Sequence, residues 1–235
     1  DEHRVANRSD FKKIEVGALI AGGGIAGSAL FRYMADSGLN PVLVNADRGS
    51  SWRNIGGGRT AFSLPELAEI AEHNHAIFKE LQKISNIDYK TTRYINLAHD
   101  EPTFNALDAS RAWSDAYMVD PKNFQKEISP YFSTKSKRYL GALITNDCWQ
   151  ATPGKVVDLI RNMGISAGGR IVEDCKVLEV MKEGSTYSIL VLTHDKKYVE
   201  FRTEIFVNAL GAGAGKICEG LGIHAGLYPV RHQAF

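Results

Sequence analysis

Six consecutive residues near the N-terminus have the types and spacing of a dinucleotide-binding turn. Gly22-Gly23-Gly24-Ile25-Ala26-Gly27 fits the pattern G-x-G-x-x-G. In that pattern the first glycine permits a tight turn, the second lets the backbone approach a pyrophosphate, and the third lets a helix pack on a strand. A helix N-terminus also offers unpaired N–H groups and a positive dipole end to phosphates. The spacing predicts Gly22, Gly24, Ile25, Ala26 and Gly27 as cofactor-binding residues; the alternative is a turn used only for packing.

The acid that usually accompanies such a turn is missing from its expected place. A carboxylate at the end of the second strand normally holds a ribose hydroxyl, but the apolar run Pro41–Val44 is followed by Asn45, and the first acid is Asp47. Asn45 can still hydrogen-bond a ribose through a neutral and weaker contact. Asp47 can take that place if the loop folds back. Both residues are therefore candidate ribose ligands.

The remaining polar residues give weaker indications of chemistry. His73 and His75 stand two apart on an expected helix and so point to different faces, which predicts no shared metal and exposure to solvent. Arg93 and His232 are candidate partners for a substrate carboxylate, with a purely structural role as the alternative for each. The sequence has neither a Ser/His/Asp order nor an H-E-x-x-H motif, and we expect no metal site.

The elements around the turn predict a βαβ unit. Residues 14–20 form a short apolar run typical of a buried strand, and apolar residues then recur at helical spacing from Ile25 to Met34. Gly38 is a helix stop, and residues 41–44 are a second buried strand. Because a helix joins the two strands, we expect them to be parallel.

The rest of the chain predicts a mixed fold. Ser63 and Glu66 form a capping box, with Pro65 in the first turn of a helix. We expect that helix to bury Leu67, Ile70, Ala71, Ile77, Phe78, Leu81 and Ile84. The expected later elements are short strands within 91–144, a helix from Thr152-Pro153 to Gly164, strands at 172–180, 187–193, 198–201 and 204–209, and a hairpin turn near His194-Asp195.

Composition excludes several classes of protein. The 235 residues include 28 Lys+Arg against 27 Asp+Glu, so the chain lacks the basic excess of a nucleic-acid-binding domain. A hydrophobic content of 44% is ordinary for a globular chain and unlike a disordered one. Cys148, Cys175 and Cys218 include no C-x-x-C pair, which favours a reducing compartment, the cytoplasm. The most apolar stretch, 16–31, is too short for a membrane span.

Four segments together resemble the FAD-dependent oxidoreductases of the D-amino-acid oxidase, glycine oxidase and sarcosine oxidase group. The resemblance covers about residues 14 to 235, and the combined order of its segments is more specific than any one of them. The segments are the glycine turn with its helix, the Ser-Ser then Gly-Gly loop at 48–59, the set Asp120-Pro121, Thr152–Lys155 and Val177, and Phe206–Ala214, which is similar to a V-N-A-x-G-A-x-A pattern.

The resemblance implies FAD as the cofactor and assigns further residues to it. The implied cofactor-binding residues are Arg48, Ser50, Ser51, Arg53, Gly57, Gly58, Arg59, Val177, Asn208, Gly211 and Ala212. Glycines let backbone N–H groups approach a flat ring, and Arg59 can stabilise an anionic reduced flavin, which makes it a candidate catalytic residue with Arg93 and His232. Val177 is expected to meet adenine through its backbone.

The expected fold is α/β, with a Rossmann-like FAD-binding domain on a parallel sheet, interrupted by a β-rich substrate-domain insertion. The expected domains are a flexible arm at 1–13, the FAD-binding domain at 14–90 and 150–222, a substrate-domain segment at 91–149, and an incomplete return to that segment at 223–235. By its length the chain resembles the first two-thirds of such an enzyme. Two interpretations stay open: the chain is one subunit of a split enzyme, with a second chain as its partner, or it is a fragment of a longer protein.

The implied activity is oxidation of the C–N bond of an amino acid or secondary amine, by hydride transfer to flavin. Two alternatives stay open. One is a non-catalytic, cofactor-holding subunit of a split flavoenzyme. The other is an NAD-dependent dehydrogenase, which shares the glycine turn and which the 56–59 loop disfavours.

Overall fold

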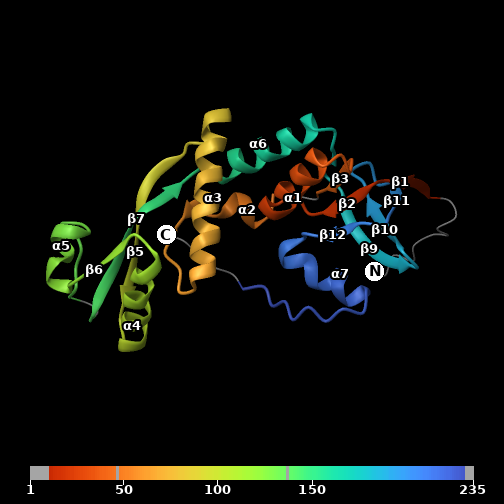
Figure 1. Ribbon diagram of the computed structural model, residues 1–235. Helices are drawn as coiled ribbons and strands as arrows, with labels where there is room; N and C mark the ends of the chain where they lie inside the picture. The colour runs from red at the N-terminus through yellow and green to blue at the C-terminus, as the bar shows by residue number, and fades with distance from the viewer. Residues whose placement is uncertain (1–10, 46–47, 136–137, 231–235) are drawn as a thin grey trace. The chain divides into compact units, whose positions relative to one another are not determined.

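The computed structural model describes residues 11–45, 48–135 and 138–230, and Figure 1 follows the chain through them. Contacts divide the chain into two compact units. Unit 1 comprises residues 1–54 and 156–235, and unit 2 comprises residues 55–155. This division rests on contacts, so the functional domain boundaries expected from the sequence stay predictions.

A four-stranded parallel sheet is the centre of unit 1. Its order is β12-β2-β3-β8, and its strands are β12 Phe206–Asn208, β2 Ala18–Ala21, β3 Pro41–Val44 and β8 Arg170–Val172. Helix α1, Ile25–Asp36, connects β2 to β3, which confirms the predicted βαβ unit. Gly38 has φ 76° and its N–H donates to the Ala35 carbonyl at 2.9 Å, so it ends the helix as predicted.

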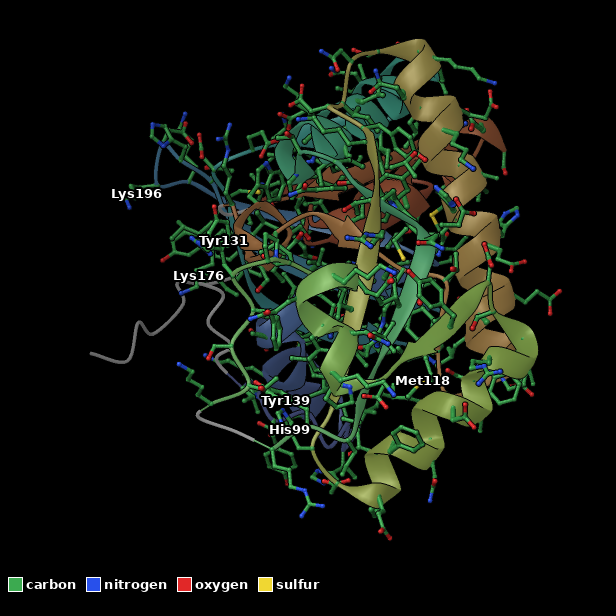
Figure 2. The ribbon with its side chains drawn as sticks, turned by 90° about the vertical axis from the view of Figure 1, so that its left-hand side faces the viewer. His99, Met118, Tyr131, Tyr139, Lys176 and Lys196 are labelled. Atoms are coloured by element: carbon green, nitrogen blue, oxygen red, sulfur yellow. The ribbon has the colours of Figure 1, made fainter. Side chains whose placement is uncertain are left out.

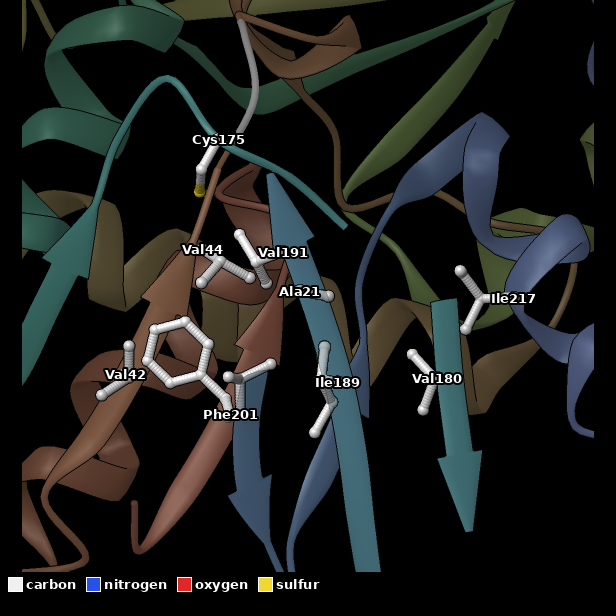
Figure 3. Packing of buried hydrophobic residues seen from close by; sticks show 10 residues of the cluster. Ala21, Val42, Val44, Cys175, Val180, Ile189, Val191, Phe201 and Ile217 are labelled. Carbon is white, nitrogen blue, oxygen red and sulfur yellow. The ribbon is translucent and has the colours of Figure 1, made fainter. Parts of the chain in front are cut away.

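Alternate residues of β2 and β3 pack on opposite faces of this sheet, as the two-residue period of a strand requires. Ile20 and Leu43 face Phe31 of α1. Their neighbours face a second core, which Figure 3 shows between β3 and β10. The buried members of that core are Leu19, Ala21, Val42, Val44, Cys175, Val180, Ile189, Val191, Phe201 and Ile217. The parallel sheet is therefore buried on both faces.

A second sheet supplies the other wall of this core. Its order is β1-β11-β10-β9, with β1 Lys12–Glu15, β11 Tyr198–Thr203, β10 Thr186–Leu192 and β9 Lys176–Glu183. Strands β9, β10 and β11 form an antiparallel meander, and β1 pairs with β11 in parallel. The turn predicted near His194-Asp195 joins β10 to β11.

Two of the predicted strands are wrong because each is broken between the two sheets. The run at 14–20 is divided into the end of β1 and the whole of β2. At the break, Val16 donates to the Arg202 carbonyl and Leu19 to the Ile205 carbonyl, and Gly17 lies too close to the Leu39 carbonyl for any side chain. The run at 172–180 is likewise divided, because Asp174 takes φ 51° between β8 and β9.

Unit 2 is built on an antiparallel sheet of order β4-β7-β5, with β6 also paired to β7. Its strands are β4 Gly57–Gly58, β5 Lys90–Ala98, β6 Ala116–Val119 and β7 Gly141–Gln150. Its helices include α3 Pro65–Ile84, α4 Glu101–Ala109 and α5 Phe124–Glu127. Figure 2 shows His99 and Tyr139 side by side, with ring centroids 4.7 Å apart.

The beginning and the packing of α3 differ from the prediction. Leu64 is its N-cap, without a side-chain cap, so the expected capping box of Ser63 and Glu66 is wrong. Ala71 and Leu81 are buried as predicted. Three of the other expected core residues are exposed on the helix surface: Leu67, Ile70 and Ile84. The apolar residues of α3 are thus spread over more of its circumference than the packed face covers.

The expected exposure of His75 is also wrong. His75 is 2% exposed and its ring stacks on Trp149, with centroids 4.4 Å apart and planes 7° apart. Its Nε2 lies 2.6 Å from the Tyr89 hydroxyl and its Nδ1 lies 3.3 Å from Asp147 Oδ2. Burial lowers the pKa of His75 from its ordinary value, despite the opposing effect of Asp147. This histidine is a core residue of unit 2, whereas His73 is exposed.

Helix α6, Pro153–Ser166, begins at the predicted position and ends one half-turn beyond Gly164, and the boundary between the units falls within it. Helix α7, Ala214–Gly220, follows β12. Across the described parts of the chain, no helix has both the length and the apolar character needed to cross a membrane.

Candidate functional site

The carboxyl ends of the four parallel strands meet at one edge of the sheet in unit 1. Gly22 follows β2, Asn45 follows β3, Glu173 follows β8 and Ala209 follows β12. In open parallel sheets, ligands bind at this edge. The glycine turn and Asn45, one of the two expected ribose ligands, therefore lie at the same edge of the sheet.

The structure explains two of the three motif glycines by contacts within the protein. Gly22 has φ 104°, and an added Cβ would collide with the Ala209 carbonyl. At Gly27 an added Cβ would collide with the Gly22 carbonyl, so glycine lets α1 pack against the turn. At Gly24 an added Cβ meets only Ser51, with its Oγ 3.0 Å away. The turn and the helix packing do not require a glycine at this middle position.

Ser51 reaches the beginning of α1. It lies in the short helix α2, Ser50–Arg53, and its Oγ accepts a hydrogen bond from the Ile25 N–H at 2.9 Å. Gly24, the N-cap of α1, provides no side-chain cap of its own. Of the other residues expected in this loop, Arg48, Ser50 and Arg53 are exposed. Ser51 is thus the member of the set that meets the glycine turn directly.

A largely buried network of hydrogen bonds holds the glycine turn. Gly23 N–H donates to Asn45 Oδ1 at 3.1 Å, and Asn45 Nδ2 donates to Glu173 Oε2 at 2.8 Å. Arg161 of α6 donates to Glu173 Oε1 at 2.7 Å, to the Gly23 carbonyl at 2.7 Å and to Ser28 Oγ at 3.2 Å. The network connects the turn to two segments more than 100 residues further along the chain.

A cavity of about 330 Å³ opens beside this network. Its lining combines apolar side chains with two lysines: Val44, Cys175, Lys176, Val177, Leu178, Leu210, Gly213, Lys216 and Ile217. Burial raises the pKa of the Cys175 thiol, so the thiol stays protonated and behaves as an apolar group. Val177, a candidate from the sequence, lies in this lining.

The residues after β12 shape the same edge. Asn208 Nδ2 donates to the Ala214 carbonyl at 2.9 Å and also contacts Cys218 Sγ at 3.4 Å. Gly211 has φ 56°, a left-handed conformation that glycine adopts without strain, and both Gly211 and Ala212 are exposed. Asn208 therefore holds the loop in which the other two candidates lie.

The remaining candidates with described positions belong to unit 2. Gly57 and Gly58 form β4, and an added Cβ at Gly58 would collide with the Trp149 ring. Packing against Trp149 is thus enough to explain glycine at position 58. An added Cβ at Gly57 would have only an ordinary contact with Ile55.

Arg59 lines a second cavity, of about 130 Å³, within unit 2. Its guanidinium donates to Asn96 Oδ1 at 3.2 Å and lies over the rings of Phe62 and Tyr94, at 4.7 and 5.1 Å from their centroids. None of the ion pairs found among the described residues involves Arg59. The Arg59 guanidinium thus has no ion-pair partner among the described residues, and such a group is suited to bind an anionic ligand.

Arg93 is separate from this cavity. It is exposed and donates to the Glu127 carbonyl at 3.0 Å, whereas its neighbour Tyr94 contacts Arg59. The structure therefore does not bring Arg93 and Arg59 together. Asp47 and His232 lie outside the described residues.

Sequence reasoning missed Arg161, Glu173 and Lys216. Arg161 had a detectable signal, because it falls on the apolar face of α6 with Val157, Ile160 and Gly164, where a charge needs a buried partner. Glu173 was hidden by the interpretation of 172–180 as one strand. No pattern in the sequence indicated that Lys216 would face the cavity.

Known proteins are similar to this chain in sequence or in fold. An anaerobic glycerol-3-phosphate dehydrogenase subunit A1 from Haloferax volcanii is 26% identical over 240 residues, which cover 90% of this chain and 39% of the relative. The structure is similar to L-proline dehydrogenase from P. horikoshii, with TM-score 0.73, 20% identity and coverage of 91% of this chain and 57% of that one. Glycine oxidase from Geobacillus kaustophilus matches with TM-score 0.71, 19% identity and coverage of 88% and 58%.

The chain spans less than two thirds of the length of each of these proteins. The family model for FAD-dependent oxidoreductases, DAO, matches residues 18–235, which include the glycine turn, the network and both cavities. The fold of the solved relatives agrees with the expected α/β architecture on a parallel sheet. The chain belongs to the DAO family of FAD-dependent oxidoreductases.

Proposed function

We propose that this chain binds FAD with the cofactor's pyrophosphate at the turn formed by residues 22–27. The observation that carries the proposal is Gly24, where an added Cβ meets only Ser51 Oγ, at 3.0 Å. A glycine that the fold does not require, at the N-terminus of α1 and on the carboxyl edge of a parallel sheet, supports close approach of a phosphate. Gly22, Ile25, Ala26 and Gly27 complete this part of the site.

The cavity lined by Val44 and Val177 is the proposed site of the adenosine moiety. Its apolar walls suit a flat base, and Lys176 and Lys216 on its lining suit the neighbouring phosphates. Gly211 and Ala212 are proposed to border the cofactor after β12, with Asn208 holding their loop. Arg48, Ser50, Ser51, Arg53, Gly57, Gly58 and Arg59 remain proposed contacts, and Ser51 has the most direct support.

We propose further that the activity is oxidation of a C–N bond in an amino acid or secondary amine. FAD would supply the hydride acceptor: loss of hydride from the carbon beside nitrogen would give an imine, which water would hydrolyse to a carbonyl compound and to ammonia or a primary amine. Arg59 is proposed to hold the substrate carboxylate, because its guanidinium lines a cavity and has no carboxylate partner among the described residues. Arg93 and His232 are weaker candidates for this role.

Oxidation of a C–O bond in glycerol 3-phosphate is the second candidate function. The relative from Haloferax volcanii, named as a glycerol-3-phosphate dehydrogenase subunit, favours it. A phosphate suits the Arg59 guanidinium as well as a carboxylate does. Because that relative is named as a subunit, the match also supports a second chain as a partner. The described cysteines are free thiols, which supports a cytoplasmic location.

Flavin spectroscopy of the full chain tests these proposals. FAD added to the protein without cofactor should lose fluorescence as it binds, and NAD should not displace it. Anaerobic addition of glycine, L-proline or sarcosine should then bleach the flavin absorbance, whereas bleaching by glycerol 3-phosphate alone would favour the second candidate. If flavin binds but none of these substrates reduces it, the result would favour a non-catalytic, cofactor-holding subunit. Unchanged FAD fluorescence at saturating protein concentration would contradict FAD binding itself.

A further inference from the structure

A carboxylate does lie at the end of a parallel strand in unit 1, but it follows β8, the neighbour of the strand β3 after which it is expected. Strands β3 and β8 pair in parallel with Val44 opposite Val172, so Asn45 and Glu173 are the next residues on neighbouring strands. The Asn45 N–H donates to the Val172 carbonyl at 3.0 Å, which continues the ladder to this point. Residue 45 is an asparagine and not an acid, but the neighbouring strand is followed by an acid, Glu173.

The side-chain amide of Asn45 is buried, and both its oxygen and its nitrogen are already hydrogen-bonded within the protein. Its Oδ1 accepts from Gly23 N–H at 3.1 Å and its Nδ2 donates to Glu173 at 2.8 Å, while only 8% of the residue is exposed. The two partners also fix the orientation of the amide, because a backbone N–H requires an acceptor and a carboxylate requires a donor. Asn45 therefore positions its neighbours and does not itself reach outward.

Glu173, in contrast, is held from one side and open on the other. Asn45 and Arg161 each occupy one carboxylate oxygen, at 2.8 and 2.7 Å. A carboxylate has about four acceptor sites, so about two remain. The side chain of Glu173 is 48% exposed, whereas that of Arg161 is 9% exposed. The cationic partner is buried beneath the carboxylate, which leaves its outer lone pairs available.

We propose that Glu173 is the carboxylate that binds the 2′- and 3′-hydroxyl groups of the adenosine ribose, with Asn45 and Arg161 as positioning residues. This inference rests on the proposed binding of FAD. The adenosine cavity supports it, because Val44 and Cys175 line that cavity and lie one residue before Asn45 and two after Glu173. Ribose hydroxyl groups donate well to a carboxylate acceptor, and the hydrogen bond from Arg161, at 2.7 Å, holds Glu173 in place there.

Competition binding with two nucleotides tests the proposal. ADP and 2′,3′-dideoxy-ADP each compete with FAD for the full chain, with flavin fluorescence as the readout, and the ratio of their dissociation constants measures the contribution of the hydroxyl groups. The wild-type chain should prefer ADP by about 10-fold to 100-fold, the range expected for hydrogen bonds to a charged group. Glu173→Gln should reduce this preference by about fivefold to tenfold, since a neutral acceptor is weaker.

Glu183→Gln is a matched control. Glu183 has the same 48% side-chain exposure and a comparable pairing with Arg202, at 2.9 Å, but it is the last residue of β9, whereas the cavity-lining residues of β9 are at its start. This variant should keep the wild-type preference for ADP. Glu173→Asp retains a charge for Arg161 and so protects the fold, but its shorter side chain should also lower the preference.

The outcomes separate this proposal from the proposed function. If Glu173→Gln and Glu173→Asp weaken both nucleotides equally, Glu173 acts only through the fold and the ribose assignment is overturned, although FAD binding stands. If the wild-type chain binds neither FAD nor ADP, both proposals are overturned. A reduced preference in the Glu173 variants, with Glu183→Gln unchanged, supports the assignment.

Discussion

Replacing Gly24 by alanine should separate cofactor binding from folding. Gly24 has φ −67° and ψ −176°, which an alanine adopts without strain, and the new methyl group meets only the terminal Oγ of Ser51. Alanine caps a helix less well than glycine, so the free energy of unfolding should fall by about 0.5–1 kcal/mol. For a chain of this size that corresponds to a decrease in melting temperature of about 1–4 °C.

The effect of Gly24→Ala on FAD affinity should be much larger. The methyl group occupies the space through which the pyrophosphate approaches the backbone, and forcing an extra methyl into a close contact costs about 1–3 kcal/mol. We therefore expect the dissociation constant of FAD to rise by about 5-fold to 150-fold. Fluorescence titration with FAD measures this change, and a thermal melt without cofactor measures the stability of the same sample.

Two other glycines provide the controls for this experiment. Gly22→Ala places a side chain at φ 104° and against the Ala209 carbonyl, so it should lower the melting temperature strongly as well as abolish binding. Gly220→Ala, at the end of α7, meets nothing within 4 Å, so it should leave the FAD affinity unchanged and should not lower the melting temperature. Unchanged FAD affinity in Gly24→Ala would refute the placement of the pyrophosphate. A melting temperature as low as that of Gly22→Ala would refute the steric reasoning.

Three further predictions concern single side chains. Burial lowers the pKa of His75, so the unfolded chain binds more protons than the folded chain between that pKa and about 6.5. The free energy of unfolding should therefore fall as pH decreases through this range. His75→Gln should flatten the pH dependence of the melting temperature, whereas His73→Gln should not. Arg161→Met removes the charge-assisted hydrogen bonds to Glu173 and to the Gly23 carbonyl, so the free energy of unfolding should fall by about 2 kcal/mol, as measured by urea denaturation. An unchanged denaturation midpoint would contradict a stabilising role for these hydrogen bonds. Arg59→Met should raise the KM for an anionic substrate about 10-fold or more, and Arg93→Met should leave it unchanged; equal effects would contradict the separation of the two arginines.

The sequence was sufficient for features that depend on near neighbours. The glycine spacing, the apolar strands around it and the stop at Gly38 predicted the βαβ unit correctly, because each acts over a few residues. Ser51 was identified through the family pattern, and its contact with Ile25 N–H is consistent with that assignment. Local rules were therefore enough to indicate the edge of the sheet at which we propose that the cofactor binds.

Features that depend on distant contacts could not be predicted in the same way. The run at 14–20 is apolar throughout, and the neighbouring strands β11 and β12 decide that it is divided between two sheets. His75 is buried because Trp149 and Tyr89 pack against it, although the three residues before it in the sequence are polar. The interaction between Asn45 and Glu173 depends on β8 lying next to β3, and no spacing in the sequence encodes that pairing.

The dependence of the glycine turn on Arg161 has a consequence for biosynthesis. The two hydrogen-bonded partners, the Gly23 carbonyl and the Arg161 guanidinium, are 138 residues apart. At the usual ~5–20 residues per second, a ribosome takes about 7–28 s to synthesise the chain between them. During that interval the first βαβ unit has emerged without β8, Glu173 or Arg161, so its nucleotide edge is incomplete. If FAD binds at this edge as proposed, its complete site exists only after most of the chain has been translated, so we expect the cofactor to be captured late in synthesis.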